Sequence, residues 1–161
     1  MSWREELGDL LAGKRKVALL GVGSVLCGDD AAGMLVASAV KEKAEERPGL
    51  LSLEGSTAPE NFCGVLRAYQ PELILLVDAA FMDVSVGEIH FLNPREIKSI
   101  PFSTHMLPLS VLVDYLQQET TASVAVIGIQ PGNTDFDTEA CTAVQDACRE
   151  LSKEILSAFQ G

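Results

Sequence analysis

The stretch KVALLGVGSVLCGDDAAGMLVASAV, residues 16–40, predicts a buried strand, a glycine-containing turn and a helix in direct succession. Residues 17–22 contain no polar side chain, as is typical of a parallel strand covered on both faces. Gly21 and Gly23 favour a tight turn, and two acidic residues, Asp29 and Asp30, stand where the helix begins. A phosphate needs backbone amides at this place, and carboxylates would repel it. The turn is therefore unsuited to a dinucleotide, and Leu26 also stands where the dinucleotide motif requires its third glycine.

The rest of the chain continues this alternation of strands and helices. The hydrophobic pattern predicts further strands at 50–55, 72–80, 87–92 and 123–131, and helices at 3–12, 30–46, 57–69, 105–118 and 137–159. Such an order predicts an α/β fold: a three-layer α/β/α domain with a mostly parallel, twisted sheet of about five strands. We expect a single domain over residues 1–161, in which residues 1–15 form an N-terminal extension.

Two details of the sheet follow from the spacing of the strands. Residues 72–80 are the most hydrophobic stretch and should form the central strand. Residues 87–92 follow too closely for a helical crossover, so we expect an antiparallel strand that pairs with 72–80 through the intervening turn. Residues 93–97 are expected to form a loop, and Thr57 and Glu60 a capping box at the start of the third helix.

Composition excludes several classes of function. A chain of 161 residues with 47% hydrophobic content can form one complete core. Its net charge of −11 argues against nucleic acid and anionic membrane surfaces as partners, and would favour a cation or a basic segment. No apolar run approaches the roughly 20 residues of a membrane span. The acidic N-terminus is unlike a secretory signal, so we expect a cytoplasmic protein with reduced cysteines.

Three candidate ligands fall on one edge of the predicted sheet. Asp30 follows the first strand, Asp78 ends the third, and His105 begins the helix before the last strand. Ligands in open α/β sheets bind beyond the carboxyl ends of the strands, where these residues could converge. Two carboxylates and an imidazole suit a divalent cation, and the imidazole favours nickel, zinc or iron over magnesium.

Each of these residues also has a purely structural interpretation. Asp30, or Asp29, could cap a helix, Asp78 could accept hydrogen bonds from loop amides, and His105 could begin a helix with nothing bound. Their common location favours the metal site over three independent structural roles. The second histidine, His90, lies within the strand at 87–92, away from the predicted site, and we interpret it as structural.

A covalent nucleophile is not evident. Ser24 lacks the G-x-S-x-G elbow, and the acidic residues around Cys27 disfavour its thiolate. The four cysteines contain no C-x-x-C pair, and Cys141 and Cys148, seven residues apart, are more typical of a buried stripe than of a zinc site. A hydrolase built on this chain would have to use metal chemistry.

Six motifs in a fixed order resemble one known family. They are G-V-G-S-x-L-x-G-D-D-x-x-G (21–33), E-G-S-T-A-P-E-N (54–61), L-I-L-L-V-D-A (73–79), G-E-I (87–89), T-H-M-L-P-L (104–109) and I-G-I-Q-P (127–131). Together they resemble the NiFe-hydrogenase maturation endopeptidases, most closely the branch that serves hydrogenase 3 of the formate-hydrogenlyase type. The resemblance spans the chain from Lys16 to the closing helix. Ser24 stands where the family usually has asparagine, and Ala31 where it usually has glycine.

The resemblance implies a peptidase that removes the C-terminal extension of a nickel-loaded hydrogenase large-subunit precursor. It also implies that Asp30, Asp78 and His105 are the metal-contacting and catalytic residues, and that the precursor supplies the nickel. The alternative is a metal-binding scaffold or chaperone that escorts nickel without cutting; a nucleotide-binding domain is a more distant possibility.

Overall fold

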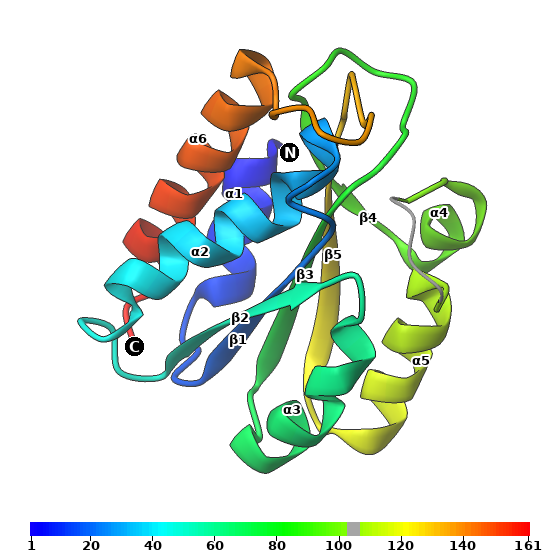
Figure 1. The fold of residues 1–161 in the computed structure, drawn as a ribbon. Coiled ribbons are helices and arrows are strands. Elements are labelled where there is room, and N and C mark those ends of the chain that lie inside the picture. The colour runs from blue at the N-terminus through cyan, green and yellow to red at the C-terminus, as the bar shows by residue number, and fades with distance from the viewer. Residues whose placement is uncertain (103–106) are drawn as a thin grey trace.

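Strands and helices alternate along the chain in the computed structural model, which describes residues 1–102 and 107–161 (Figure 1). The elements, including two short 3₁₀ turns named η1 and η2, are α1 (Trp3–Leu11), β1 (Val17–Val22), η1 (Gly28–Ala31), α2 (Ala32–Ala44), β2 (Leu50–Ser56), η2 (Pro59–Phe62), α3 (Cys63–Tyr69), β3 (Leu73–Ala79), β4 (Ile89–Leu92), α4 (Pro94–Ser99), α5 (Leu109–Glu119), β5 (Ser123–Ile129) and α6 (Thr142–Ala158). In the described ranges, no helix has both the length and the apolar composition needed to cross a bilayer.

The five strands form one mixed sheet in the order β2-β1-β3-β5-β4. β1, β2, β3 and β5 are parallel, and β4 is antiparallel to β5. The predicted fold class and the central position of β3 are confirmed. The predicted partner of β4 is wrong, because β5 occupies the edge of β3 and β4 pairs with the outer edge of β5.

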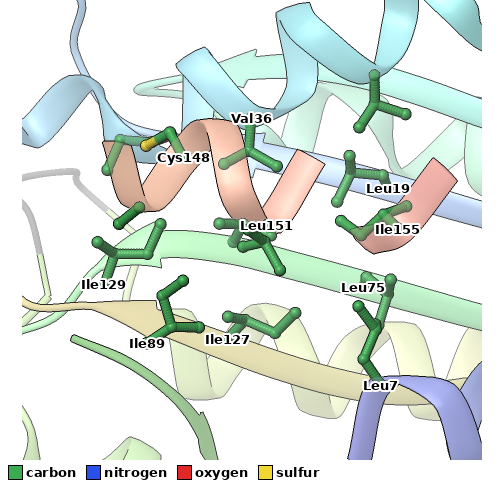
Figure 2. Close-up of a cluster of buried hydrophobic side chains, with 14 of the residues drawn as sticks. Leu7, Leu19, Val36, Leu75, Ile89, Ile127, Ile129, Cys148, Leu151 and Ile155 are labelled. Atoms are coloured by element: carbon green, nitrogen blue, oxygen red, sulfur yellow. The ribbon is translucent and has the colours of Figure 1, made fainter. Parts of the chain in front are cut away.

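Helices cover both faces of the sheet, as Figure 1 shows: α1, α2 and α6 lie on one face and α3, α4 and α5 on the other. Along β3, side chains alternate between these two layers, so Leu75 contributes to the α2–α6 core and Leu76 to the α3–α5 core. Figure 2 shows Leu75 in the first of these cores. Leu7 of α1 is fully buried in the same cluster, so the N-terminal residues are part of the core.

Several helix boundaries differ from the prediction. The expected loop at 93–97 is α4, because Asn93 and Glu96 form a reciprocal capping box with Pro94 in the first turn. The expected capping box at Thr57 does not form; a 3₁₀ turn begins after Ala58, without a side-chain cap. The closing helix begins at Thr142, five residues later than predicted, because the preceding residues form a loop against the turn after β1.

Candidate functional site

Asp30 lies in the turn that connects β1 to α2. Only 4% of this residue is exposed, and its Oδ2 accepts a hydrogen bond from the backbone N–H of Ser24 at 2.9 Å. The turn requires Gly23, because its φ is +137° and a Cβ there would overlap the carbonyl oxygen of Asp30. The second of the two acidic residues is therefore held against the carboxyl end of β1.

Two glycines allow this turn to lie close to the sheet. A Cβ on Gly33 would overlap the carbonyl oxygens of Val22 and Val77, and a Cβ on Gly21 would overlap the carbonyl oxygen of Gly33. The first turn of α2 therefore packs directly on the backbones of β1 and β3. This close approach brings η1, which contains Asp30, into contact with β3.

Asp78 is the penultimate residue of β3 and is fully buried. Its neighbours Val77 and Ala79 pack toward α2 and α6, whereas Leu76 and Ala80 pack toward α3 and α5. Because successive strand side chains point to opposite faces, the Asp78 carboxylate is directed toward the α3–α5 layer. It stands at the carboxyl end of the central strand, as the sequence predicted.

The third predicted ligand, His105, lies outside the described residues. The last described residues before it lie close to the end of β3. Phe102 forms a β-bridge with Ala80, and Phe81 donates its N–H to the carbonyl oxygen of Pro101 at 2.9 Å. The described segment up to Phe102 therefore runs beside the residues that directly follow β3.

The turn after β1 and the end of β3 thus carry the two carboxylates of the predicted cation site. Among the residues that the structure describes, no group of three histidine, cysteine, aspartate or glutamate side chains could hold a metal ion. The donor set that suits nickel, two carboxylate oxygens and an imidazole nitrogen, would be complete only with His105.

The structure shows that the two adjacent acidic residues, Asp29 and Asp30, have different contacts, which the sequence alone could not show. Asp29 is fully buried and accepts hydrogen bonds from the backbone N–H groups of Gly132, Asn133 and Cys141, at 2.7, 3.1 and 2.7 Å. Its role was missed because these donors lie more than a hundred residues away in the sequence. No local pattern marks them.

A family model described as hydrogenase maturation protease matches residues 34–158 of the chain. The chain belongs to the hydrogenase maturation protease family. The matched region includes the positions of Asp78 and His105, and Asp30 lies just before it. The relatives are proteases, which favours a hydrolase over the non-proteolytic nickel carrier.

Individual relatives agree with this assignment. The chain is 35% identical to the hydrogenase 3 maturation protease of Escherichia coli K12 over 138 residues, which cover 85% of this chain and 86% of the relative. The crystal structure of a NiFe-hydrogenase maturation protease from Thermococcus kodakarensis KOD1 superposes with a TM-score of 0.88 at 31% identity, covering 97% of this chain and 99% of that one. A crystal structure of a hydrogenase 3 maturation protease gives 0.76 at 32% identity, with 91% and 92% covered.

His90 of this maturation protease lies at the edge of the sheet. It pairs across β4 and β5 with Gly128, which in turn pairs with Asp78, so two strand spacings of about 4.8 Å each separate the backbones of His90 and Asp78. Its ring is exposed, and its Nε2 lies 3.1 Å from Oε1 of Glu88. These contacts agree with the structural interpretation of His90.

Burial disfavours two thiols of the protease, Cys63 and Cys148, as nucleophiles. Burial, together with the nearby Asp29 carboxylate, raises the pKa of Cys148 to about 12, and its Sγ donates to the carbonyl oxygen of Ala32 at 3.4 Å. Burial also raises the pKa of the Cys63 thiol. Cys141 precedes α6, so the two cysteines do not form one helical stripe; its Sγ lies 3.3 Å from Asp29 Oδ2.

Large apolar side chains are exposed around Asp30. Val25 and Leu26, in the same turn, are each 59% exposed, and Phe136, in the loop before α6, is 74% exposed. The two loops are joined because Asp137 donates its N–H to the carbonyl oxygen of Leu26 at 2.7 Å. We call Val25, Leu26 and Phe136 the apolar rim. Exposed apolar side chains grouped in this way are typical of a surface that contacts another protein.

Proposed function

We propose that this protease removes a C-terminal segment from the large-subunit precursor of a NiFe hydrogenase, and that Asp30, Asp78 and His105 recognise the nickel of that precursor. The observation that supports the proposal most is the burial of Asp30 and Asp78 at the carboxyl ends of the adjacent strands β1 and β3. A carboxylate is rarely buried without a partner or a function, and this edge is where α/β folds bind ligands.

The proposed chemistry divides the roles between enzyme and substrate. Nickel in the precursor would supply Lewis-acid chemistry at the scissile carbonyl. Asp30 and Asp78 would provide oxygen donors of fixed position, and His105 a nitrogen donor, so that the precursor is held with its scissile peptide at this edge. The protein would then act as a metal-dependent peptidase of the aspartic type, without a covalent intermediate.

A protein substrate agrees with the surface around the site. The apolar rim lies in the same turn as Asp30 and in the loop joined to it, so a bound protein could cover these side chains and approach the two carboxylates together. We also place the reaction in the cytoplasm.

The first test is processing of purified precursor, followed by intact-mass measurement. Asp30→Asn, Asp78→Asn and His105→Ala should each abolish removal of the tail. Asp114→Asn makes the same chemical change at an exposed position of α5 and should process normally. Normal processing by Asp78→Asn or His105→Ala would refute the site assignment.

The second test addresses nickel. Precursor from nickel-depleted cells should keep its tail, and the same precursor should lose it after nickel insertion. A free peptide that copies the tail junction should remain whole. Efficient cutting of nickel-free precursor would exclude recognition through the metal and leave the protease assignment intact. If nickel is inserted and the mass of the precursor polypeptide does not change, the result would support the non-proteolytic carrier.

A further inference from the structure

The buried carboxylate of Asp29 joins two loops that are distant in the sequence. Oδ2 accepts hydrogen bonds from the N–H groups of Gly132 and Asn133 at 2.7 and 3.1 Å, and Oδ1 accepts one from Cys141 at 2.7 Å. The thiol of Cys141 also lies within reach of Oδ2, at 3.3 Å. We call residues 130–141, which connect β5 to α6, the clasp loop. Both oxygens of Asp29 are thus engaged by donors from this loop.

Backbone contacts continue the same junction on either side of Asp29. Gly28 donates its N–H to the carbonyl oxygen of Thr138 at 2.9 Å, and Asp29 donates its own to Asn133 at 2.8 Å. Gly28 has a φ of +55°, and a Cβ at this position would overlap the carbonyl oxygen of Asn133. The turn and the clasp loop are therefore in direct contact, and the Asp29 carboxylate provides the side-chain hydrogen bonds of this contact.

Asp29 and Asp30 have different surroundings because they are consecutive residues of the 3₁₀ turn η1. Such a turn has three residues per turn, so neighbouring side chains diverge by about 120°. The side chain of Asp29 is bound to the clasp loop, whereas Oδ2 of Asp30 accepts from Ser24 in the turn itself. Fixing the rotation of η1 through Asp29 consequently fixes the direction in which Asp30 points.

We propose that Asp29 is a positioning residue for the protease: by binding the clasp loop, it holds η1 so that Asp30 keeps its orientation beside β3. This inference rests on the proposed role of Asp30. Asparagine cannot replace Asp29, because its amide group would present N–H donors to backbone N–H groups in either orientation of the side chain. The backbone bonds at Gly28 and Asp29 would remain, so the expected effect is a loosened turn within a folded protein.

The test compares Asp29→Asn with Ile155→Val in steady-state processing of nickel-loaded precursor. Ile155 is fully buried near the C-terminal end of α6, and its substitution weakens the core without altering either loop. For Asp29→Asn we expect kcat to fall on the order of 10²-fold, the loss that a misplacement of about 1 Å can cause, and KM to rise, because a displaced Asp30 also holds the precursor less well. Ile155→Val should lower the melting temperature and retain the wild-type kcat at a temperature where it is folded.

Amide hydrogen exchange measures the junction without substrate. In Asp29→Asn, the N–H groups of Gly132, Asn133 and Cys141 should lose protection, while those of β3 keep theirs. A folded Asp29→Asn protein with exposed amides and wild-type kcat would overturn the inference, and so would an equal loss of kcat in Ile155→Val. An inactive wild-type protein would instead refute the proposed function.

A second variant keeps the test decisive if Asp29→Asn does not fold. Asn133→Ala removes the side-chain oxygen that accepts from the N–H of Asp135 at 2.9 Å, and so loosens the clasp loop from its exposed side. It leaves the Asp29 carboxylate and its donors in place. The kcat should fall in the same direction but by less, and an unchanged kcat would contradict the role of the clasp loop.

Discussion

Replacing Gly33 with alanine should separate α2 from the sheet and displace the candidate site. The added Cβ would overlap the carbonyl oxygens of Val22 and Val77 and lie 2.7 Å from the nitrogen of Val22, whereas ordinary contact begins at 3.4 Å. All three atoms belong to strand backbones and cannot rotate away. The first turn of α2 must therefore move outward by about 1 Å.

The size of the effect follows from two opposing contributions. Alanine is favoured over glycine in a helix by roughly 0.5–1 kcal/mol, but overpacking a rigid contact costs about 1–3 kcal/mol. The steric cost exceeds the gain, so the free energy of unfolding should decrease by about 1–2 kcal/mol, or roughly 2–8 °C in melting temperature for a chain of this size. A shift of about 1 Å at η1 should also slow processing on the order of 10²-fold.

Gly8 provides the matched control for this experiment. No atom lies within 4 Å of a Cβ built on Gly8 in α1, so Gly8→Ala should be neutral or stabilising by up to about 1 kcal/mol, with wild-type processing. Thermal melting and intact-mass kinetics of the precursor measure both effects. Wild-type melting and wild-type processing in Gly33→Ala would show that the close contact between α2 and the sheet does not set the position of the site.

Three further outcomes are expected. His90→Gln should retain processing, because the exposed ring of His90 has Glu88 as its polar contact within the described residues; a folded but inactive variant would contradict this placement of His90. The pKa of Cys148 is raised above its ordinary value, so the protonated thiol contributes fully to stability below about pH 9, and this contribution is lost as the pH rises toward 12. Melting curves at alkaline pH should show the loss of stability, and this pH dependence should be absent in Cys148→Ala. Hydrogen bonds from the N–H groups of Arg15 and Lys16 lower the pKa of Glu72. The contribution of Glu72 to the free energy of unfolding is therefore present above its unfolded pKa near 4.5 and is lost as the pH falls through the folded pKa. Glu72→Gln should differ from wild type in melting temperature at pH 7 and converge with it in acid.

Local patterns in the sequence determined the fold class and the edge of the sheet at which to look for the site. The apolar runs of β1, β3 and β5 predict buried parallel strands without reference to any distant residue. Asp30 lies in the turn after one such strand and Asp78 at the end of another, so the topological rule for α/β folds was sufficient to select them. The capping box at Asn93 and Glu96, with Pro94 in the first turn, is also a local pattern, so the sequence itself contains the signal for α4.

Tertiary structure alone decided what depends on partners far apart in the chain. β4 pairs with β5 because β5 occupies the edge of β3. Which of the two strands pairs with β3 is a competition that the local sequence of neither strand reveals. Asp29 and Asp30 are identical side chains in adjacent positions, and they differ because only Asp29 meets the backbone donors of the clasp loop. Those donors are N–H groups that every residue except proline carries, so no residue type marks them, and only the folded chain brings them to one carboxylate.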